Sequence, residues 1–386
     1  MVGTTSYDWI VVGAGLSGAT LAERIASQLG QTVLVVDKRP HIAGNAHDPV
    51  IEGVRVHRYG AHLFHTSSER VWRYLSTFTA WRPHTHRVRG VVDGRVVPLP
   101  VNLDTLSSLL GRDEGRRFGH RLIDRYGEGT KLPMLRLLED ADDELAALGR
   151  VVYEKIYLSY TIKQWGRSPD ELDPSVTGRV PLVLSHDDRY FRDAYQALPA
   201  DGYDALVTRM LDHPDITVAV STPIADLGTS VRSRHMVFTG PLDELCDYEY
   251  GALPYRTLSF DDRWHQCGPR QEVAVVNHPA AASYTRVIEH AHFSAGHEFE
   301  PTVLTYEHPG EHIPGVTEPY YPLPVREAHA LYRRYEALAA TVHPRTVLAG
   351  RLARYRYLDM DQAVNLALQT FTSRVVPMAL GQEVPC

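Results

Sequence analysis

Apolar residues near the amino terminus form two short uninterrupted runs, at residues 10–12 and 33–36. Between these runs, residues 19–26 mix alanine, leucine and isoleucine with polar side chains, as is typical of a helix. Uninterrupted apolar runs of this length are typical of strands buried in a parallel sheet. The pattern therefore predicts a strand, a helix and a second strand, which is the beginning of an α/β domain.

The middle of the chain changes its pattern twice. Residues 87–100 contain two β-branched runs on either side of Asp93-Gly94, which predicts a hairpin. From residue 101 to residue 165 we expect several amphipathic helices, because apolar residues recur at steps of three or four, as at Leu145, Leu148, Val152 and Ile156. The prolines, tyrosines and short β-branched runs that follow favour an antiparallel sheet.

We therefore expect an α/β fold in three parts. The first is a discontinuous parallel-sheet domain, to which strands near residues 216–220, 236–240 and 346–349 return. The expected boundaries are residues 1–80, 204–249 and 330–386 for this domain, 101–178 for a helical domain, and 81–100, 179–203 and 250–329 for the antiparallel sheet domain.

A G-x-G-x-x-G motif, Gly13, Gly15 and Gly18, connects the first strand to the first helix. In dinucleotide-binding turns these glycines permit the tight turn, the approach of a pyrophosphate and close packing of helix and strand. Asp37 lies 24 residues after Gly13, at the end of the second strand, where a carboxylate can bind a ribose. A second small-residue turn at Gly44 favours a flavin over a nicotinamide dinucleotide.

Composition and charge exclude several classes of protein. The 386 residues carry a formal charge of -7, which gives no overall attraction to nucleic acid or to an anionic membrane. Three cysteines without C-x-x-C spacing favour a reducing compartment, and no apolar run is long enough to span a membrane. The twenty histidines lack the spacing of a metal site. We expect a cytoplasmic protein without a metal, whose chemistry comes from a cofactor.

Arginine and tyrosine are the best candidates for binding a substrate. Arg179, Arg286 and Arg351 stand beside aromatic residues or glycine, and arginines that converge on one cleft would suit a diphosphate. For a single arginine a structural salt bridge is an equally good interpretation, for example between Arg286 and Glu289. The 21 tyrosines could offer a sugar or base an apolar face with a hydrogen-bonding tip, although for any one of them simple packing is the plainer interpretation.

Five segments together resemble the bacterial UDP-galactopyranose mutases, in the same order as in that family. They are residues 59–66 (YGAHLFHT), 160–166 (YTIKQWG), 284–290 (YTRVIEH), 319–322 (PYYP) and 350–360 (GRLARYRYLDM). The resemblance covers the chain from about Tyr7 to Gln369. It implies a Rossmann-type FAD-binding domain with an inserted helical bundle and an antiparallel sheet, and a substrate cleft between them.

The resemblance also implies an activity, which is a mutase that interconverts the pyranose and furanose forms of a nucleotide-diphosphate sugar. In that family the N5 atom of reduced FAD attacks the anomeric carbon, and the sugar opens as a flavin iminium before it closes to the other ring size. The default substrate is UDP-galactopyranose, which becomes UDP-galactofuranose. An external reductant such as NAD(P)H and a homodimer are further implications.

The resemblance assigns roles to individual residues. Catalytic roles fall to Arg179, Arg286, His62 and His65. Substrate-binding roles fall to Tyr160, Trp165, Tyr190, Tyr321, Tyr357, Asn277, His86, Ile156 and Tyr157. Cofactor-binding roles fall to Gly13, Gly15, Gly18, Asp37, Lys38, Gly44, Asn45, His62, Gly240, Arg351, Asp359 and Met360.

Departures from the family pattern concern the specificity of the cleft. Ile156 and Tyr157 stand where the family usually has two aromatic residues, and His86 stands where it usually has an asparagine that reaches the sugar. The arginine that commonly follows Arg179 is absent from the segment at Pro181. A GDP- or TDP-sugar, with galactose, fucose or rhamnose, is therefore an alternative substrate.

Two other classes of protein share parts of the pattern. A flavin amine oxidase or desaturase would have the same glycine motif, but it would turn over without added reductant and consume an acceptor. A non-catalytic nucleotide-sugar binding protein could keep the arginines without turnover.

Overall fold

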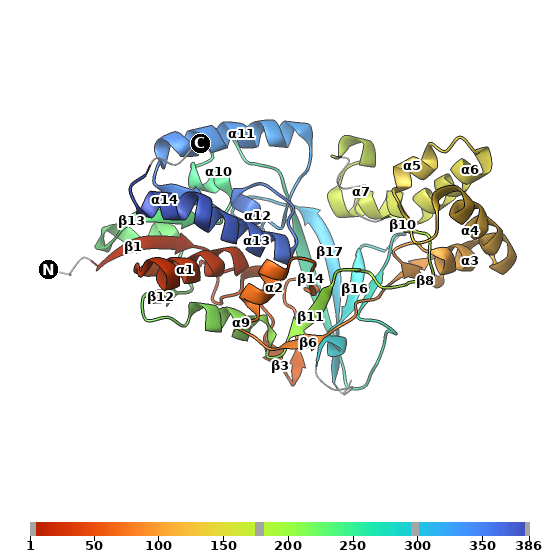
Figure 1. Ribbon diagram of the computed structural model, residues 1–386, viewed down its shortest axis with the longest axis horizontal. Coiled ribbons are helices and arrows are strands. Elements are labelled where there is room, and N and C mark those ends of the chain that lie inside the picture. The colour runs from red at the N-terminus through yellow and green to blue at the C-terminus, as the bar shows by residue number, and fades with distance from the viewer. Residues whose placement is uncertain (1–4, 174–180, 281, 295–300, 383–386) are drawn as a thin grey trace.

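The computed structural model describes residues 5–173, 181–280, 282–294 and 301–382. Its first unit is a five-stranded, fully parallel sheet in the order β12-β2-β1-β13-β19. The strands are β12 (Ile216–Ala219), β2 (Val33–Val36), β1 (Thr5–Val12), β13 (Val231–Phe238) and β19 (Thr346–Leu348). This sheet confirms the predicted α/β fold class, and three of its strands come from distant parts of the chain (Figure 1).

Helices cover this sheet and bury its apolar side chains. Trp9, Val11, Val33 and Val35 alternate along their strands and are fully buried against the helices of one face. These helices are α1 (Leu16–Leu29), α9 (Gly202–Leu211) and α13 (Met360–Thr370), the last followed by η6 (Phe371–Val375) and α14 (Val376–Ala379). A separate apolar cluster joins α10 (Leu242–Leu245), α11 (Arg326–Val342) and the segment around α12 (Gly350–Ala353).

The second unit is a seven-stranded sheet in the order β18-β14-β17-β16-β15-β7-β8. Its strands are β18 (Tyr321–Pro322), β14 (Tyr255–His265), β17 (Thr302–Glu311), β16 (Arg286–Glu289), β15 (Val275–Asn277), β7 (Val88–Val92) and β8 (Arg95–Leu99). The hairpin predicted around Asp93-Gly94 is confirmed as β7 and β8. The sheet is mixed rather than wholly antiparallel, because β7 runs parallel to β15.

Two segments expected in the large sheet lie elsewhere. β11 (Tyr195–Pro199) pairs with both β5 (Phe64–Thr66) and β6 (Trp81–Pro83) in a separate three-stranded sheet, and β10 (Leu182–Val183) pairs with β9 (Lys131–Leu132). The stacked rings of Trp72, Trp81 and Tyr195 hold the small sheet against α2 (Glu69–Leu75), which explains why these short strands pair there.

The third unit is a group of helices at the far end of the molecule from the parallel sheet (Figure 1). It comprises α3 (Leu103–Leu110), α4 (Arg112–Tyr126), α5 (Met134–Leu138), α6 (Asp143–Val152), η2 (Tyr153–Leu158) and α7 (Ser159–Trp165). Asn102 and Asp142 cap the amino ends of α3 and α6. η2 is a short π-helical stretch between α6 and α7, so the three form one continuous helical run.

Candidate active site

The glycine motif forms the turn between β1 and α1. Gly13 has a φ of +103°, and a Cβ atom there would lie 2.0 Å from Oγ1 of Thr239. A Cβ atom at Gly18 would lie 1.9 Å from the carbonyl oxygen of Gly13, so a side chain at either position would push the turn apart. The amino end of α1 follows at once, and Gly15 at its N-cap offers no side chain to the free N–H groups.

Asp37 braces this turn. One carboxylate oxygen accepts a hydrogen bond from the N–H of Ala14 at 2.8 Å, and the other accepts from the N–H of Arg39 at 2.9 Å. The acidic residue thus fixes the two loops that leave β1 and β2 at the same edge of the sheet, where ligands bind in open α/β sheets.

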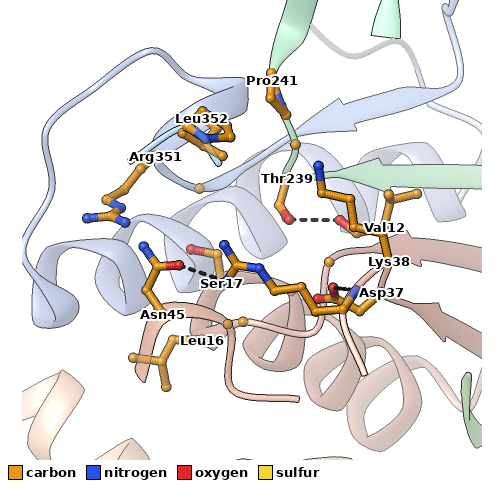
Figure 2. Close-up of a pocket in the computed structure, with 18 of the residues that line it drawn as sticks. Val12, Leu16, Ser17, Asp37, Lys38, Asn45, Thr239, Pro241, Arg351 and Leu352 are labelled. Atoms are coloured by element: carbon orange, nitrogen blue, oxygen red, sulfur yellow. Dashed lines mark hydrogen bonds between the residues drawn. The ribbon is translucent and has the colours of Figure 1, made fainter. Parts of the chain in front are cut away.

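The second small-residue turn lies directly against the first. Gly15 and Ala43 form an isolated parallel bridge, and Asn45 accepts a hydrogen bond from Arg39 at 2.8 Å. Arg39 also donates to Glu318 at 3.1 Å. Figure 2 shows Asp37 and Lys38 at one end of the resulting cavity, and Asn45 and Arg351 at the other.

The structure gathers every residue predicted for cofactor binding around this cavity, whose volume is about 290 Å³. Those lining residues are Gly13, Gly15, Gly18, Asp37, Lys38, Gly44, Asn45, His62, Gly240, Arg351, Asp359 and Met360. Arg351 forms no ion pair with any residue that the structure describes, which leaves its guanidinium available to an anion. Sequence reasoning missed Arg39, Glu318 and Thr239, which also line the cavity.

His62 lies where this cavity approaches a second group of predicted residues. Its Nδ1 contacts the carbonyl oxygen of Gly60 at 2.8 Å, and burial, followed by the charges of Arg351 and Arg286, lowers the pKa of His62 to about 4. A carbonyl oxygen only accepts, so the neutral ring carries its proton on Nδ1 and leaves Nε2 free of a proton.

His65 is placed differently from His62. It is not among the residues that line the cofactor cavity; its Nδ1 contacts Asp193 at 3.0 Å and its ring stacks on Phe191 with the centroids 3.5 Å apart.

Arg286 is the centre of the second group. Its Nε lies 3.1 Å from Glu307, and its guanidinium donates to the hydroxyl of Tyr160 at 3.2 Å. Burial opposes the charge of Arg286, but Glu307 and the surrounding tyrosines raise its pKa well above its ordinary value. Burial also raises the pKa of Tyr160 to about 12.

The structure corrects the salt bridge suggested between Arg286 and Glu289. Glu289 instead accepts hydrogen bonds from the N–H groups of Arg270 and Gln271 and from the hydroxyl of Thr302. The two residues lie three positions apart on β16, so their side chains point to opposite faces of the sheet. Sequence reasoning missed Glu307, the residue that does pair with Arg286.

Two polar residues near Arg286 have buried atoms without a partner in the part of the chain that the structure describes. Asn277 stands directly opposite Arg286 in the register of β15 and β16, and its Oδ1 has no hydrogen-bond partner. His86 is 5% exposed, its Nδ1 is likewise without a partner, and burial lowers its pKa to about 3. Such groups are costly unless a ligand or water satisfies them.

An aromatic wall lies between Arg286 and the cofactor cavity. The rings of Tyr321 and Tyr357 stack with their centroids 5.0 Å apart, and Trp165 lies about 6 Å from both. Arg351 reaches this wall from the cofactor cavity, with its guanidinium carbon 5.7 Å from the Tyr321 ring. The two groups of predicted residues therefore form one continuous site.

The remaining predicted residues lie at the edges of this site. Tyr190 packs against His86. Burial, and after it the nearby Tyr190, raises the pKa of Tyr157, whose hydroxyl has no partner among the described residues. Ile156 is 5% exposed and belongs to the main hydrophobic core. Arg179 lies outside the described residues.

The described residues contain no helix that is long and apolar enough to cross a membrane, and no group of three or more potential metal ligands.

Comparison with known proteins identifies the chain's relatives. A family model described as UDP-galactopyranose mutase matches residues 155–357, and a model for an NAD(P)-binding Rossmann-like domain matches residues 11–78. The chain is 35% identical to a probable UDP-galactopyranose mutase of Klebsiella pneumoniae, over 97% of both chains. It is also 33% identical to a dTDP-fucopyranose mutase of Escherichia coli, over 93% of this chain and 96% of that one.

A crystal structure of reduced UDP-galactopyranose mutase shares the fold, with a TM-score of 0.71, 15% identity, and coverage of 98% of this chain and 94% of the other. With the family model spanning more than half of its length and curated relatives matched almost end to end, the chain belongs to the UDP-galactopyranose mutase family.

Proposed function

We propose that this enzyme interconverts the pyranose and furanose forms of a nucleotide-diphosphate sugar, and that Arg286 holds the diphosphate. The observation that carries the proposal is the position of Arg286. Its guanidinium is paired with Glu307 and Tyr160, surrounded by tyrosines, and close enough to His62 to lower that residue's pKa. The cofactor cavity and an anion-binding group therefore meet at His62.

FAD is the cofactor of the enzyme, and the residues of the cavity suit it. The uncapped amino end of α1 and the guanidinium of Arg351, which pairs with no described acid, suit a pyrophosphate, and the facing turns at Gly15 and Gly44 offer main chain rather than side chains. When bound and reduced, FAD supplies a nucleophilic ring nitrogen to the reaction. The Asp37 carboxylate and the main chain of residues 43–45 would position the cofactor.

Arg286 acts on the leaving group. The bond between the anomeric carbon and the diphosphate must break and later re-form, so the released anion has to stay beside the sugar. A guanidinium neutralises this charge and holds two oxygens in a fixed plane. Glu307 orients that plane, since it lies 3.1 Å from Nε, and the N–H groups that Tyr160 does not engage are proposed to bind phosphate oxygens. Arg179 is proposed as a second cation from the sequence alone.

His62 is suited to accept a proton and not to donate one. With its ring proton held on Nδ1 by the Gly60 carbonyl, the unprotonated Nε2 is the atom available to a substrate hydroxyl. We propose that it takes part in proton transfer during ring opening and closure. We propose that His65, which is paired with Asp193, stabilises the segment that carries His62.

The identity of the sugar nucleotide is also a proposal. UDP-galactopyranose is the default substrate, while the relative from Escherichia coli is named for a dTDP-sugar. We propose that Trp165, Tyr321 and Tyr357 contact the nucleotide, and that the unpaired atoms of Asn277 and His86 bind substrate hydroxyls. An external reductant such as NAD(P)H, a homodimer and a cytoplasmic location complete the proposal.

Arg286→Ala tests the assignment. We expect turnover to fall at least about a thousandfold, because a half-buried cation that stabilises the leaving anion is lost, while bound flavin stays near wild-type stoichiometry. Arg263→Ala is the matched control, since Arg263 lies on β14 and pairs with Asp261 at the surface. The same measurement on Arg179→Ala tests the second cation. Near-normal turnover of Arg286→Ala would refute the diphosphate assignment.

A further inference from the structure

A second cavity, of about 180 Å³, lies beside the loop that carries His62. It is separate from the cofactor cavity and shares no lining residue with it. Its polar wall consists mainly of Arg55, Arg82, His57 and Asp48, and Phe293 and Tyr203 add aromatic surface. The polar residues come from the segment 48–57, next to His62, and from β6.

The charge on this wall is unbalanced. Arg82 donates to the carbonyl oxygen of Phe293 and forms no ion pair with any described residue. Arg55 and Arg82 line the same cavity, and burial, followed by the charge of Arg55, lowers the pKa of Arg82. Like charges held together in a partly buried cavity are unfavourable until an anion joins them.

Asp48 does not supply the missing charge for Arg82. Its carboxylate oxygens accept hydrogen bonds from the N–H groups of Tyr203 and Asp204, both at 2.9 Å, and Arg55 lies 3.6 Å away. The carboxylate is therefore already engaged by two donors and one cation. One positive charge remains uncompensated on the described wall.

His57 adds a donor to the same wall. It is 2% exposed, and its Nδ1 accepts a hydrogen bond from the N–H of His62 at 3.0 Å, so its ring proton must be on Nε2. No described residue accepts a hydrogen bond from this Nε2. An imidazole N–H on a wall with two arginines has the chemistry of an oxyanion site.

We propose that this cavity binds a small oxyanion of the phosphate class between Arg55, Arg82 and His57, as a site separate from the diphosphate position at Arg286. Because the same imidazole holds the main-chain N–H of His62, an anion in this cavity changes the environment of the cofactor through a single residue. The shared chemistry is a phosphate group, either as free phosphate or as part of a larger phosphomonoester.

The test uses flavin-loaded enzyme that carries Arg286→Ala, which removes the other proposed anion position. Thermal unfolding is followed while inorganic phosphate replaces chloride at constant ionic strength. We expect a saturable rise in Tm. In Arg82→Met the phosphate concentration that gives half of this rise should increase at least about tenfold. Arg73→Met is the control, since Arg73 is exposed on α2 and paired with Glu69, and it leaves the rise unchanged.

A second variant keeps the test decisive if Arg82→Met does not fold. In His57→Asn the amide oxygen can still accept from His62, whereas the shorter side chain withdraws its N–H donors from the position of Nε2. We expect weaker phosphate binding and a smaller phosphate-induced change in the flavin absorption spectrum. Glycerol 3-phosphate in place of phosphate separates the free ion from a phosphomonoester. A rise in Tm with phosphate but not with glycerol 3-phosphate assigns the site to the free ion, and a rise with both shows that the site accepts a phosphomonoester. The proposal would be overturned if phosphate gave no specific rise in Tm, or if both variants kept the full rise.

Discussion

Neutral, buried histidines are concentrated around the catalytic cleft. Burial lowers the pKa of His62 and His290 to about 4, and that of His86 to about 3. The hydrogen bonds of His290 show why its neutral form is required: it accepts from the N–H of His57 at Nδ1 and contacts Thr305 with Nε2. A second proton on this ring would have no acceptor among the described residues, so His290 orders the site as an uncharged connector.

His290 is expected to make stability depend on pH. Its ordinary pKa is 6.5 and its folded pKa is about 4, so the unfolded chain takes up a proton first as the pH falls. Unfolding free energy is therefore lost between pH 6.5 and pH 4, by about 3 kcal/mol for this group. In His290→Gln, denaturant unfolding should show a shallower pH dependence in this window. His120→Gln, exposed on α4, is the control, and an unchanged slope in His290→Gln would contradict the assignment.

At the scale of elements, α7 joins the helical unit to the large sheet through two cations. Nζ of Lys163 donates to three main-chain carbonyls between β15 and β16, at 2.7, 2.7 and 3.0 Å. Arg256 on β14 donates to the carbonyl of Gln164 at 3.0 Å. The helix that carries Tyr160 and Trp165 is thus fixed to the strands that carry Asn277 and Arg286.

Lys163→Met should loosen this attachment while keeping the apolar stem. Because each of the lost hydrogen bonds involves a charged donor, we expect a loss of about 2 kcal/mol in unfolding free energy and a rise of about tenfold in KM, with a smaller change in kcat. Lys155→Met is the control, since Lys155 lies on the same helical run and pairs with the exposed Asp93. Equal effects of the two substitutions on KM would contradict a positioning role for Lys163.

The turn between β1 and α1 gives a second prediction for an element. In Gly18→Ala the new methyl group would meet the carbonyl of Gly13 at 1.9 Å, and this oxygen belongs to rigid main chain. We expect purified Gly18→Ala to hold less than about a tenth of the wild-type flavin, measured by absorbance, because the turn that receives the pyrophosphate is displaced. Gly119→Ala on α4 would meet only the end of the Leu103 side chain, at 3.3 Å, and should keep its flavin.

For the whole molecule, sequence reasoning succeeded where the determinants are local. The glycine turn, Asp37, the second small-residue turn and the hairpin at Asp93-Gly94 are each specified by a few consecutive residues. It failed where partners are distant in the sequence. Glu307 on β17 pairs with Arg286 on the neighbouring strand β16, and Arg39 donates a hydrogen bond to Glu318, 279 residues later. The pairing of β11 with β5 and β6 was likewise missed, because nothing in such short strands identifies their neighbours.

The family resemblance supplied what local patterns could not. It gathered His62, Trp165, Arg286, Tyr321 and Arg351 into one site from separate segments, and the structure places them along a continuous wall. The resemblance gave no information about the cavity at Arg82, because that cavity depends on how β6 and the segment 48–57 meet.

The most direct test of the central claim is chromatography of the enzyme with UDP-, TDP- and GDP-sugars, with and without dithionite. The account predicts that at least one nucleotide sugar equilibrates between its pyranose and furanose forms when the flavin is reduced, without consumption of oxygen, and that Arg286→Ala abolishes this exchange. The absence of exchange for every sugar nucleotide offered to fully reduced enzyme, or equal exchange with the flavin oxidised, would contradict it.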